Sequence, residues 1–310
     1  MNISHVESLG FRDSTSVSFE VDSLPTRHEE WAEAIDELPL EVLLGPINST
    51  ELNLVSHREE SYEMSRKADG SLRRDWWAAD HAWHIDGTPR IIQPAYTIIA
   101  CKEAEQGSPD TQLLDMVRLT EVLEEDGFWE RHGIDADDLA KMESIFANST
   151  YYEQALPYMR SRASTDDAVQ INEILQNDWS KAGVDDMVDF VAVMDSKYPP
   201  KAFPTLRHKP VKNLPAVFVD GGVKNSRLLS GDGLDHTDVL RALRQEYLTG
   251  YAPERRGLVK SIGWAANRCI IFPQVGTLHR AMPGNQHDRS LFLGFYVHKG
   301  DLEQGREDGN

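Results

Sequence analysis

The sequence predicts a mainly β fold of α+β character, namely a β-sandwich or barrel interrupted by a large helical insert. Strand-like apolar stretches occur near both ends of the chain, whereas the middle carries apolar residues at three- and four-residue spacing. The length of 310 residues and the hydrophobic content of 40% suit a single sizeable core, and no internal repeat is visible. We therefore expect one domain over residues 1–310, with the helical insert at about 113–200 and a loose polar tail at about 299–310.

The N-terminal part of the chain predicts a strand, a helix and a second strand. Residues 15–21 alternate in the manner of a strand, and residues 27–38 place Trp31 and Leu38 on one helical face. Residues 91–101 form a β-rich apolar run, in which Pro94 indicates a bulge or an edge position.

The middle and the C-terminal part complete the pattern. Helical spacing, with Asp or Thr as a cap near several starts, predicts helices at 116–123, 137–146, 166–175 and 185–193. A Pro-rich bend is expected at 198–204, a strand at 216–219 and a helix at 237–248. The chain then returns to strands at 258–264, 268–272 and 291–297. This β–helical–β order favours one interrupted β core over two independent domains.

Charge and composition exclude several classes of partner. The 32 basic and 51 acidic residues give a net charge of −19, which repels phosphate backbones and anionic membranes. No apolar run approaches a membrane span, and the N-terminus lacks the pattern of a signal peptide. Cys101 and Cys269 lie in apolar strand-like stretches and are interpreted as buried free thiols. We expect a cytoplasmic protein without a nucleic-acid or membrane partner.

A histidine and an aspartate two residues apart, His84 and Asp86, are the most informative feature of the chain. Alternate residues of a strand point the same way, so both side chains can reach one ion. A further histidine, His279, lies far downstream. Two imidazoles and one carboxylate form a facial site for Fe(II) that leaves three coordination positions open. Arg289 begins the apolar stretch RSLFLGFYV, where its guanidinium needs a carboxylate partner such as a small dicarboxylate.

A second pair of the same spacing, His236 and Asp238, receives a structural interpretation. It stands at the start of the predicted helix at 237–248, where Asp235 or Thr237 is a natural N-cap. Residues two apart on a helix do not face each other. This pair is therefore not expected to bind a metal.

The motifs together resemble the TauD/TfdA-type Fe(II)/2-oxoglutarate-dependent dioxygenases. The pattern of that family is His-x-Asp, a Thr or Ser about 25 residues on, a distal His, and an Arg roughly ten to fifteen residues later. Here Thr111 lies 25 residues after Asp86, and Arg289 lies ten residues after His279. The resemblance covers roughly residues 75–120 and 205–298.

The resemblance implies a fold, a cofactor and a set of ligands. The fold is a double-stranded β-helix (jelly-roll, cupin-like) with a helical insert. Fe(II) would be bound by His84, Asp86 and His279. The cosubstrate 2-oxoglutarate would be held by Thr111, and by Arg289 at its distal carboxylate.

The implied reaction uses O2 to oxidise an unactivated C–H bond of a small molecule, with succinate and CO2 as co-products. The expected substrate is an amino acid or a natural-product intermediate of secondary metabolism, and hydroxylation is the expected outcome. Related halogenases carry Ala or Gly in place of Asp86, so this carboxylate favours hydroxylation, desaturation or ring formation over halogenation. Sulfonate-oxidising relatives carry a second Arg where Leu293 stands, which argues against a sulfonate substrate. Asp80 and His81 directly precede the metal motif and are candidate substrate contacts.

Two other functions remain open from the sequence. One is a non-redox metalloenzyme, such as a Zn or Mn hydrolase or isomerase. The other is a catalytically silent binding protein on the same barrel. Thr111 and Arg289 favour the oxygenase, because a metallohydrolase has no need of a dicarboxylate clamp.

Overall fold

The chain is built mainly of antiparallel sheets. A computed structural model describes residues 2–12, 16–25, 30–31, 33–34, 37–44, 52–61, 83–85, 94–105, 107–147, 196, 199–208, 213–220, 225–282 and 289–300. Within these residues the strand pairings are antiparallel. The predicted mainly β fold is thereby confirmed.

Two sheets carry the part of the fold that positions the site. The six-stranded sheet has the order β1 (Ile3–Ser8), β2 (Val17–Val21), β12 (Arg268–Pro273), β4 (Tyr96–Ala104), β14 (Arg289–His298) and β3 (Leu52–Ser61). The smaller sheet has the order β11 (Val259–Ile262), β5 (Thr111–Asp115) and β13 (Thr277–Ala281). Strands distant in sequence are thus neighbours in both sheets.

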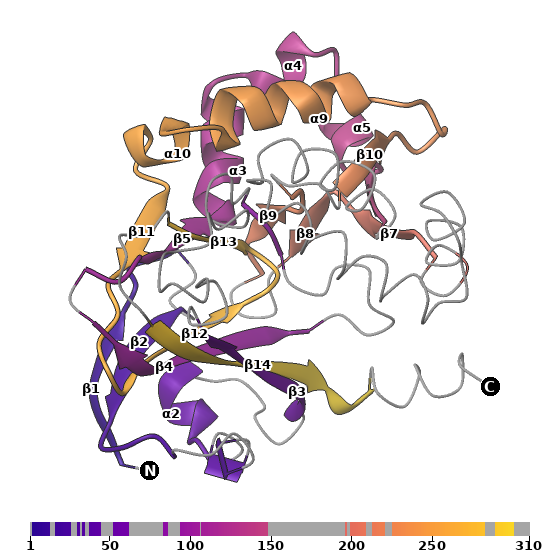
Figure 1. The fold of residues 1–310 in the computed structure, drawn as a ribbon. Helices are drawn as coiled ribbons and strands as arrows, with labels where there is room; N and C mark the ends of the chain where they lie inside the picture. The colour runs from indigo at the N-terminus through magenta and orange to yellow at the C-terminus, as the bar shows by residue number, and fades with distance from the viewer. Residues whose placement is uncertain are drawn as a thin grey trace, which may run out of the picture.

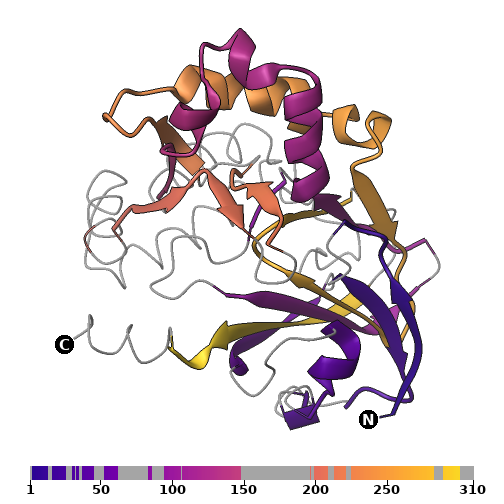
Figure 2. The same ribbon diagram turned by 180° about the vertical axis from the view of Figure 1, so that it is seen from behind.

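Two further sheets and several short helices complete the described part of the molecule. The sheets are β10 (Asn225–Leu229), β6 (Glu143–Phe146) and β7 (Lys201–Pro204), and the pair β8 (Leu206–His208) and β9 (Pro215–Val217). The helices are α2 (Leu40–Leu44), α3 (Met116–Glu125), α4 (Phe128–Arg131), α5 (Ala136–Leu139), α9 (Thr237–Leu243) with the π-helical turn η3 (Arg244–Leu248), and α10 (Ala252–Arg255). Helices α3, α4 and α9 lie on the opposite side of the six-stranded sheet from α2 (Figure 1), and the view from behind agrees (Figure 2).

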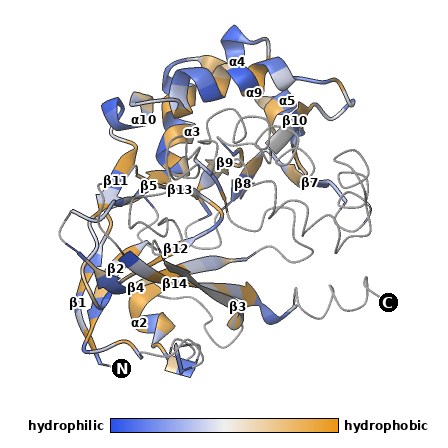
Figure 3. Ribbon diagram, in the orientation of Figure 1, coloured by the Kyte–Doolittle hydropathy of each residue, from blue (hydrophilic) through white to orange (hydrophobic). Residues whose placement is uncertain are grey.

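Side chains alternate between the two faces of the six-stranded sheet, and both faces are buried. On one face, Ile99 of β4, Ile270 of β12 and Leu291 of β14 pack with Leu113 and Trp264, which lie on or beside the smaller sheet. This cluster is the interior between the two sheets. The other face packs against α2, whose hydrophobic residues are visible in Figure 3. Because both faces are covered, the central strands contain nearly continuous apolar runs.

Several predicted elements are confirmed. Strands at 15–21, 216–219, 258–264, 268–272 and 291–297 correspond to β2, β9, β11, β12 and β14. The helix at 116–123 is α3, and its first turn is capped by Asp115, whose carboxylate accepts the amide of Val117 at 3.0 Å. Pro94 lies just before β4 rather than within it.

The large helical insert predicted at about 113–200 is not supported. The segment 137–146, predicted as one helix, contains the end of α5 and then strand β6. Strand β6 pairs with β10 on one side and β7 on the other, so hydrogen bonds to distant segments override its local helical spacing. The bend predicted at 198–204 instead contains strand β7. Because β7 lies at the edge of its sheet, Pro204 is tolerated there although it has no N–H to donate. The predicted helices at 166–175 and 185–193 lie outside the described residues.

Two smaller expectations concern the cysteines and membrane segments. Cys101 and Cys269 are buried free thiols, as predicted, and they belong to the clusters on opposite faces of the six-stranded sheet. Burial raises the pKa of the Cys101 thiol to about 11. Among the residues that the structure describes, no helix is long and apolar enough to cross a membrane.

The close packing of β14 predicts a large effect at Gly294. A Cβ atom at this position would meet Ile98 Cγ2 at 2.9 Å and Leu54 Cδ1 at 3.1 Å. Ile98 is β-branched and stiff, so its methyl group cannot easily move aside. Gly294→Ala should therefore lower the free energy of unfolding by about 1–3 kcal/mol, measured by chemical denaturation. Gly300→Ala is the matched control, because a Cβ atom there would meet nothing within 4 Å, and equal stability losses in both variants would contradict the prediction.

Candidate active site

The structure brings His84 and His279 together. The two residues form an isolated antiparallel bridge, in which His84 N–H donates to His279 O at 3.0 Å and His279 N–H donates to His84 O at 3.1 Å. Residues directly opposed in such a pair direct their side chains to the same face. The ring centroids accordingly lie 4.2 Å apart. Two of the three predicted metal ligands are thus neighbours, although one comes from each half of the chain.

The side chain of His279 lies on the interior face of strand β13. Its register partner on β5 is Leu113, and its ring lies 5.4 Å from the ring of Phe272. Both apolar residues belong to the cluster between the two sheets. His279 is only 6% exposed, whereas His84 is half-buried. The histidine pair therefore stands at the boundary between the apolar interior and a more open side.

Thr111 shares that face with His279. It is the first residue of β5, two positions before Leu113, so both residues point the same way. Its register partner on β13 is Ala281, which makes His279 its diagonal neighbour, with Cα atoms typically ~7–8 Å apart. The hydroxyl of Thr111, which is 3% exposed, accepts a hydrogen bond from Trp264 Nε1 at 3.0 Å.

Arg289 reaches the same region from the six-stranded sheet. It begins β14 and has the same strand parity as Leu291 and Leu293, whose side chains lie between the two sheets. It is 4% exposed, and its Nη1 donates a hydrogen bond to the carbonyl of Pro109, two residues before Thr111. Burial raises the pKa of the Cys101 thiol, and the nearby Arg289 charge opposes that rise. The predicted 2-oxoglutarate residues thus lie close together in the fold.

Asp86, Asp80 and His81 lie outside the described residues, so their roles stay predictions. No group of three or more His, Cys, Asp or Glu side chains with metal-site geometry occurs within the described ranges, which hold two of the three predicted ligands.

A polar network behind the histidine pair was not predicted from the sequence. Arg280, next to His279, lies with its Cζ 4.2 Å from the ring of Trp83, next to His84. Its Nε donates to Gln112 Oε1 at 2.9 Å, and its Nη2 donates to Glu254 Oε1 at 2.5 Å. Burial lowers the pKa of Arg280, and Glu254 opposes that change. These contacts join the segment that carries His84 to the strand that carries His279, on the face opposite the two imidazoles. An arginine within a buried strand was the only local signal for it.

A buried carboxylate supports the His84 segment from another side. Asp220 is 0% exposed, and its Oδ2 accepts the backbone N–H of Ile85 at 3.4 Å. Its own carbonyl accepts Arg244 Nε at 3.0 Å, and burial lowers the pKa of that guanidinium. Asp220 thus contacts the backbone between the predicted ligands His84 and Asp86. The local signal for it was an aspartate at the end of the apolar run 216–219.

The second His-x-Asp pair lies at the start of helix α9, as its sequence context predicted, although His236 and not Asp235 or Thr237 is the N-cap residue. The carboxylate of Asp235 accepts the backbone N–H of Thr237, the first residue of α9, at 2.8 Å. Asp238 is exposed and pairs with Arg241 at 2.5 Å. His236 is therefore a suitable control residue for experiments on His84 and His279, the predicted metal-binding histidines.

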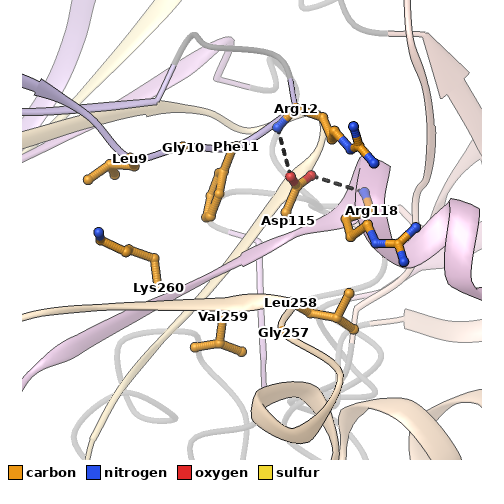
Figure 4. A pocket seen from close by; sticks show the side chains of 10 residues that line it. All are labelled: Leu9, Gly10, Phe11, Arg12, Asp115, Arg118, Gly257, Leu258, Val259 and Lys260. Atoms are coloured by element: carbon orange, nitrogen blue, oxygen red, sulfur yellow. Dashed lines mark hydrogen bonds between the residues drawn. The ribbon is translucent and has the colours of Figure 1, made fainter.

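A separate surface pocket offers no comparable chemistry. It is lined by Leu9, Gly10, Phe11, Arg12, Asp115, Arg118, Gly257, Leu258, Val259 and Lys260 (Figure 4). Asp115 accepts the backbone N–H of Arg12 at 3.0 Å and caps α3, so the amides at that helix start are already satisfied. The guanidinium of Arg118 pairs with Glu121 at 2.8 Å. We assign no ligand to this pocket.

Comparison with known proteins gives a likeness of fold. No protein-family model matches the chain, and no curated protein matches it in sequence. The crystal structure of AAD-2 in complex with Mn(II) and N-oxalylglycine matches with a TM-score of 0.52 and 14% identity, covering 92% of this chain and 84% of that chain. The crystal structure of a taurine dioxygenase from Burkholderia xenovorans matches with a TM-score of 0.46 and 13% identity, covering 92% of this chain and 76% of that chain. The likeness to AAD-2 shows a shared fold.

Proposed function

We propose that this chain is a TauD/TfdA-type Fe(II)/2-oxoglutarate-dependent oxygenase that oxidises an unactivated C–H bond of a small molecule. The observation that carries the proposal is the bridge that sets the rings of His84 and His279 4.2 Å apart, on the face that also holds Thr111. The shared fold with AAD-2 supports it, because that protein was crystallised with Mn(II) and N-oxalylglycine. N-oxalylglycine is an isostere of 2-oxoglutarate in which an NH group replaces one CH2 group.

The donor set fits a divalent metal ion. Two ring nitrogens that share one ion lie about 3 Å apart, given metal–nitrogen distances near ~2.1 Å. Rings with centroids 4.2 Å apart satisfy that requirement after small side-chain rotations. With Asp86 as the third ligand, the site would offer the two imidazoles and one carboxylate that suit Fe(II). The hydrogen-bonded bridge supplies the rigid backbone that holds the two rings in place.

The protein residues would then bind and orient 2-oxoglutarate. Arg289 and Thr111 would hold its distal carboxylate by charge-assisted hydrogen bonds, for which a guanidinium is well shaped. Leu113 and Phe272 would exclude water from the inner side of the site. When bound, Fe(II) and 2-oxoglutarate would supply the chemistry that activates O2. O2 would be the oxidant both for the decarboxylation of 2-oxoglutarate to succinate and CO2 and for the C–H bond of the substrate.

The finer aspects of the proposal concern the substrate. We propose hydroxylation of an amino acid or natural-product intermediate, with Asp80 and His81 as substrate contacts beside the metal. A screen of such compounds for stimulated succinate release identifies the substrate. Equal succinate release with and without every compound would count against this part of the proposal alone.

Anaerobic titration tests the proposed function. Addition of Fe(II) and then 2-oxoglutarate should give a weak visible metal-to-ligand charge-transfer band, which neither component gives with the protein alone. His236→Ala should leave the band unchanged, because that residue is the N-cap of α9 and belongs to the other His-x-Asp pair. Metal binding without 2-oxoglutarate binding would instead favour a non-redox metalloenzyme. The absence of metal binding would favour a silent binding protein, and either result would overturn the proposal.

A further inference from the structure

The indole of Trp264 makes a hydrogen bond that determines how the Thr111 hydroxyl can act. Trp264 Nε1 lies 3.0 Å from Thr111 Oγ1, and both side chains are buried, with 8% and 3% of their surfaces exposed. An indole N–H can only donate a hydrogen bond, whereas a hydroxyl has one proton and two lone pairs. The Thr111 oxygen must therefore be the acceptor in this pair. Its own proton consequently points away from the indole.

The turn that carries Trp264 is fixed on both sides. It connects β11 to β12, and Arg268 Nη1 donates to the carbonyl of Gly263 at 2.7 Å. The N–H of Arg268 donates to Ala265 O at 3.1 Å, and the N–H of Asn267 donates to Cys101 O at 2.8 Å. Trp264 itself packs in the cluster between the two sheets. The indole N–H is thus held in place by the structure on either side of it.

We propose that Trp264 is a positioning residue, which fixes the Thr111 hydroxyl as a hydrogen-bond donor to the distal carboxylate of 2-oxoglutarate. This inference rests on the proposed function. The hydrogen bond from Trp264 polarises the hydroxyl and so strengthens its donation to a carboxylate. Arg289, which reaches Pro109 beside Thr111, donates to the same anion. The two donors together select a ligand group that accepts hydrogen bonds and carries negative charge.

A double-mutant cycle tests the inference by calorimetry of 2-oxoglutarate binding to the Fe(II)-loaded protein without O2. Trp264→Phe removes the N–H and keeps an aromatic ring, and Thr111→Val removes the hydroxyl and keeps the shape. Each single variant should bind 2-oxoglutarate about 3–10-fold more weakly, the range expected for one hydrogen bond. The double variant should bind no more weakly than Thr111→Val, since the indole acts only through the hydroxyl. Fe(II) affinity should be unchanged throughout.

The conservative variant Thr111→Ser should restore the effect of Trp264 on 2-oxoglutarate binding. Thr111→Ser keeps the hydroxyl, so Trp264→Phe should again weaken binding about 3–10-fold in that background. Losses that multiply in the Trp264→Phe, Thr111→Val protein would show that Trp264 acts by packing alone, and would overturn the inference. So would wild-type affinity in Trp264→Phe. A wild-type protein that binds no 2-oxoglutarate would instead refute the proposed function.

A spectroscopic measurement avoids any change at Trp264. In the 15N–1H spectrum of the wild-type protein, one buried indole signal should shift when 2-oxoglutarate binds. The same signal should shift in the Thr111→Val variant without ligand, because its acceptor has been removed. If Thr111→Val moves no indole signal, the hydrogen bond does not exist in solution and the inference fails.

Discussion

His279→Ala should abolish measurable Fe(II) binding and, with it, 2-oxoglutarate turnover. The residue is buried on the inner face of β13 and its ring lies beside that of His84, so no other described imidazole can replace it at this place. Loss of a residue that only supports a metal ligand costs about 10–100-fold in affinity. Loss of a ligand itself should therefore cost more than ~100-fold, measured by anaerobic titration with Fe(II).

The control for this variant separates metal binding from folding. His236→Ala removes a histidine from the other His-x-Asp pair and should keep wild-type Fe(II) affinity. His279→Gln retains a polar side chain in the buried site and should lose Fe(II) affinity while keeping the wild-type circular dichroism spectrum. A folded His279→Gln protein that binds Fe(II) as tightly as the wild type would remove His279 from the metal site.

Arg289→Ala should weaken 2-oxoglutarate binding by roughly 30-fold or more. Truncating one partner of a buried, hydrogen-bonded charge pair costs about 2–5 kcal/mol, and each 1.4 kcal/mol corresponds to about a tenfold change in affinity. Arg289 is 4% exposed, so water cannot easily replace its hydrogen bonds to a carboxylate. Arg289→Lys should give an intermediate loss, since lysine keeps the charge but lacks the planar fork. Calorimetry with 2-oxoglutarate and the Fe(II)-loaded protein measures both variants.

The same measurements show whether Arg289 is a ligand residue or a structural one. Fe(II) affinity should stay within about twofold of wild type in Arg289→Ala, because the guanidinium is not expected to bind the metal. Arg241→Ala is the control, since that side chain is 70% exposed on α9 and pairs only with its neighbour Asp238 in the described structure. Equal losses of Fe(II) and 2-oxoglutarate affinity would indicate that Arg289 stabilises the sheet.

Local patterns were most reliable where one strand or helix buries a regular face. The apolar runs of β12 and β14 identified central strands, because both faces of that sheet are covered. Helix α3 was predictable from its spacing and from its Asp115 cap. The segment 137–146 was wrongly predicted, because its three- and four-residue spacing does not reveal that β6 finds partners in β7 and β10. Strand pairing joins residues too distant in sequence for a local window to detect.

The candidate site likewise has features that the sequence predicts and features that only the structure reveals. By itself, the sequence determined which residue types could perform the chemistry, because two histidines, an aspartate, a threonine and an arginine at these spacings form a recognisable set. Only the tertiary structure decided that His84 opposes His279, that Arg280 lies against Trp83, and that Trp264 donates to Thr111. Hydrogen bonds between strands and between side chains form between segments that the packed sheets bring together. The spacing of residues along the sequence does not show which segments these will be.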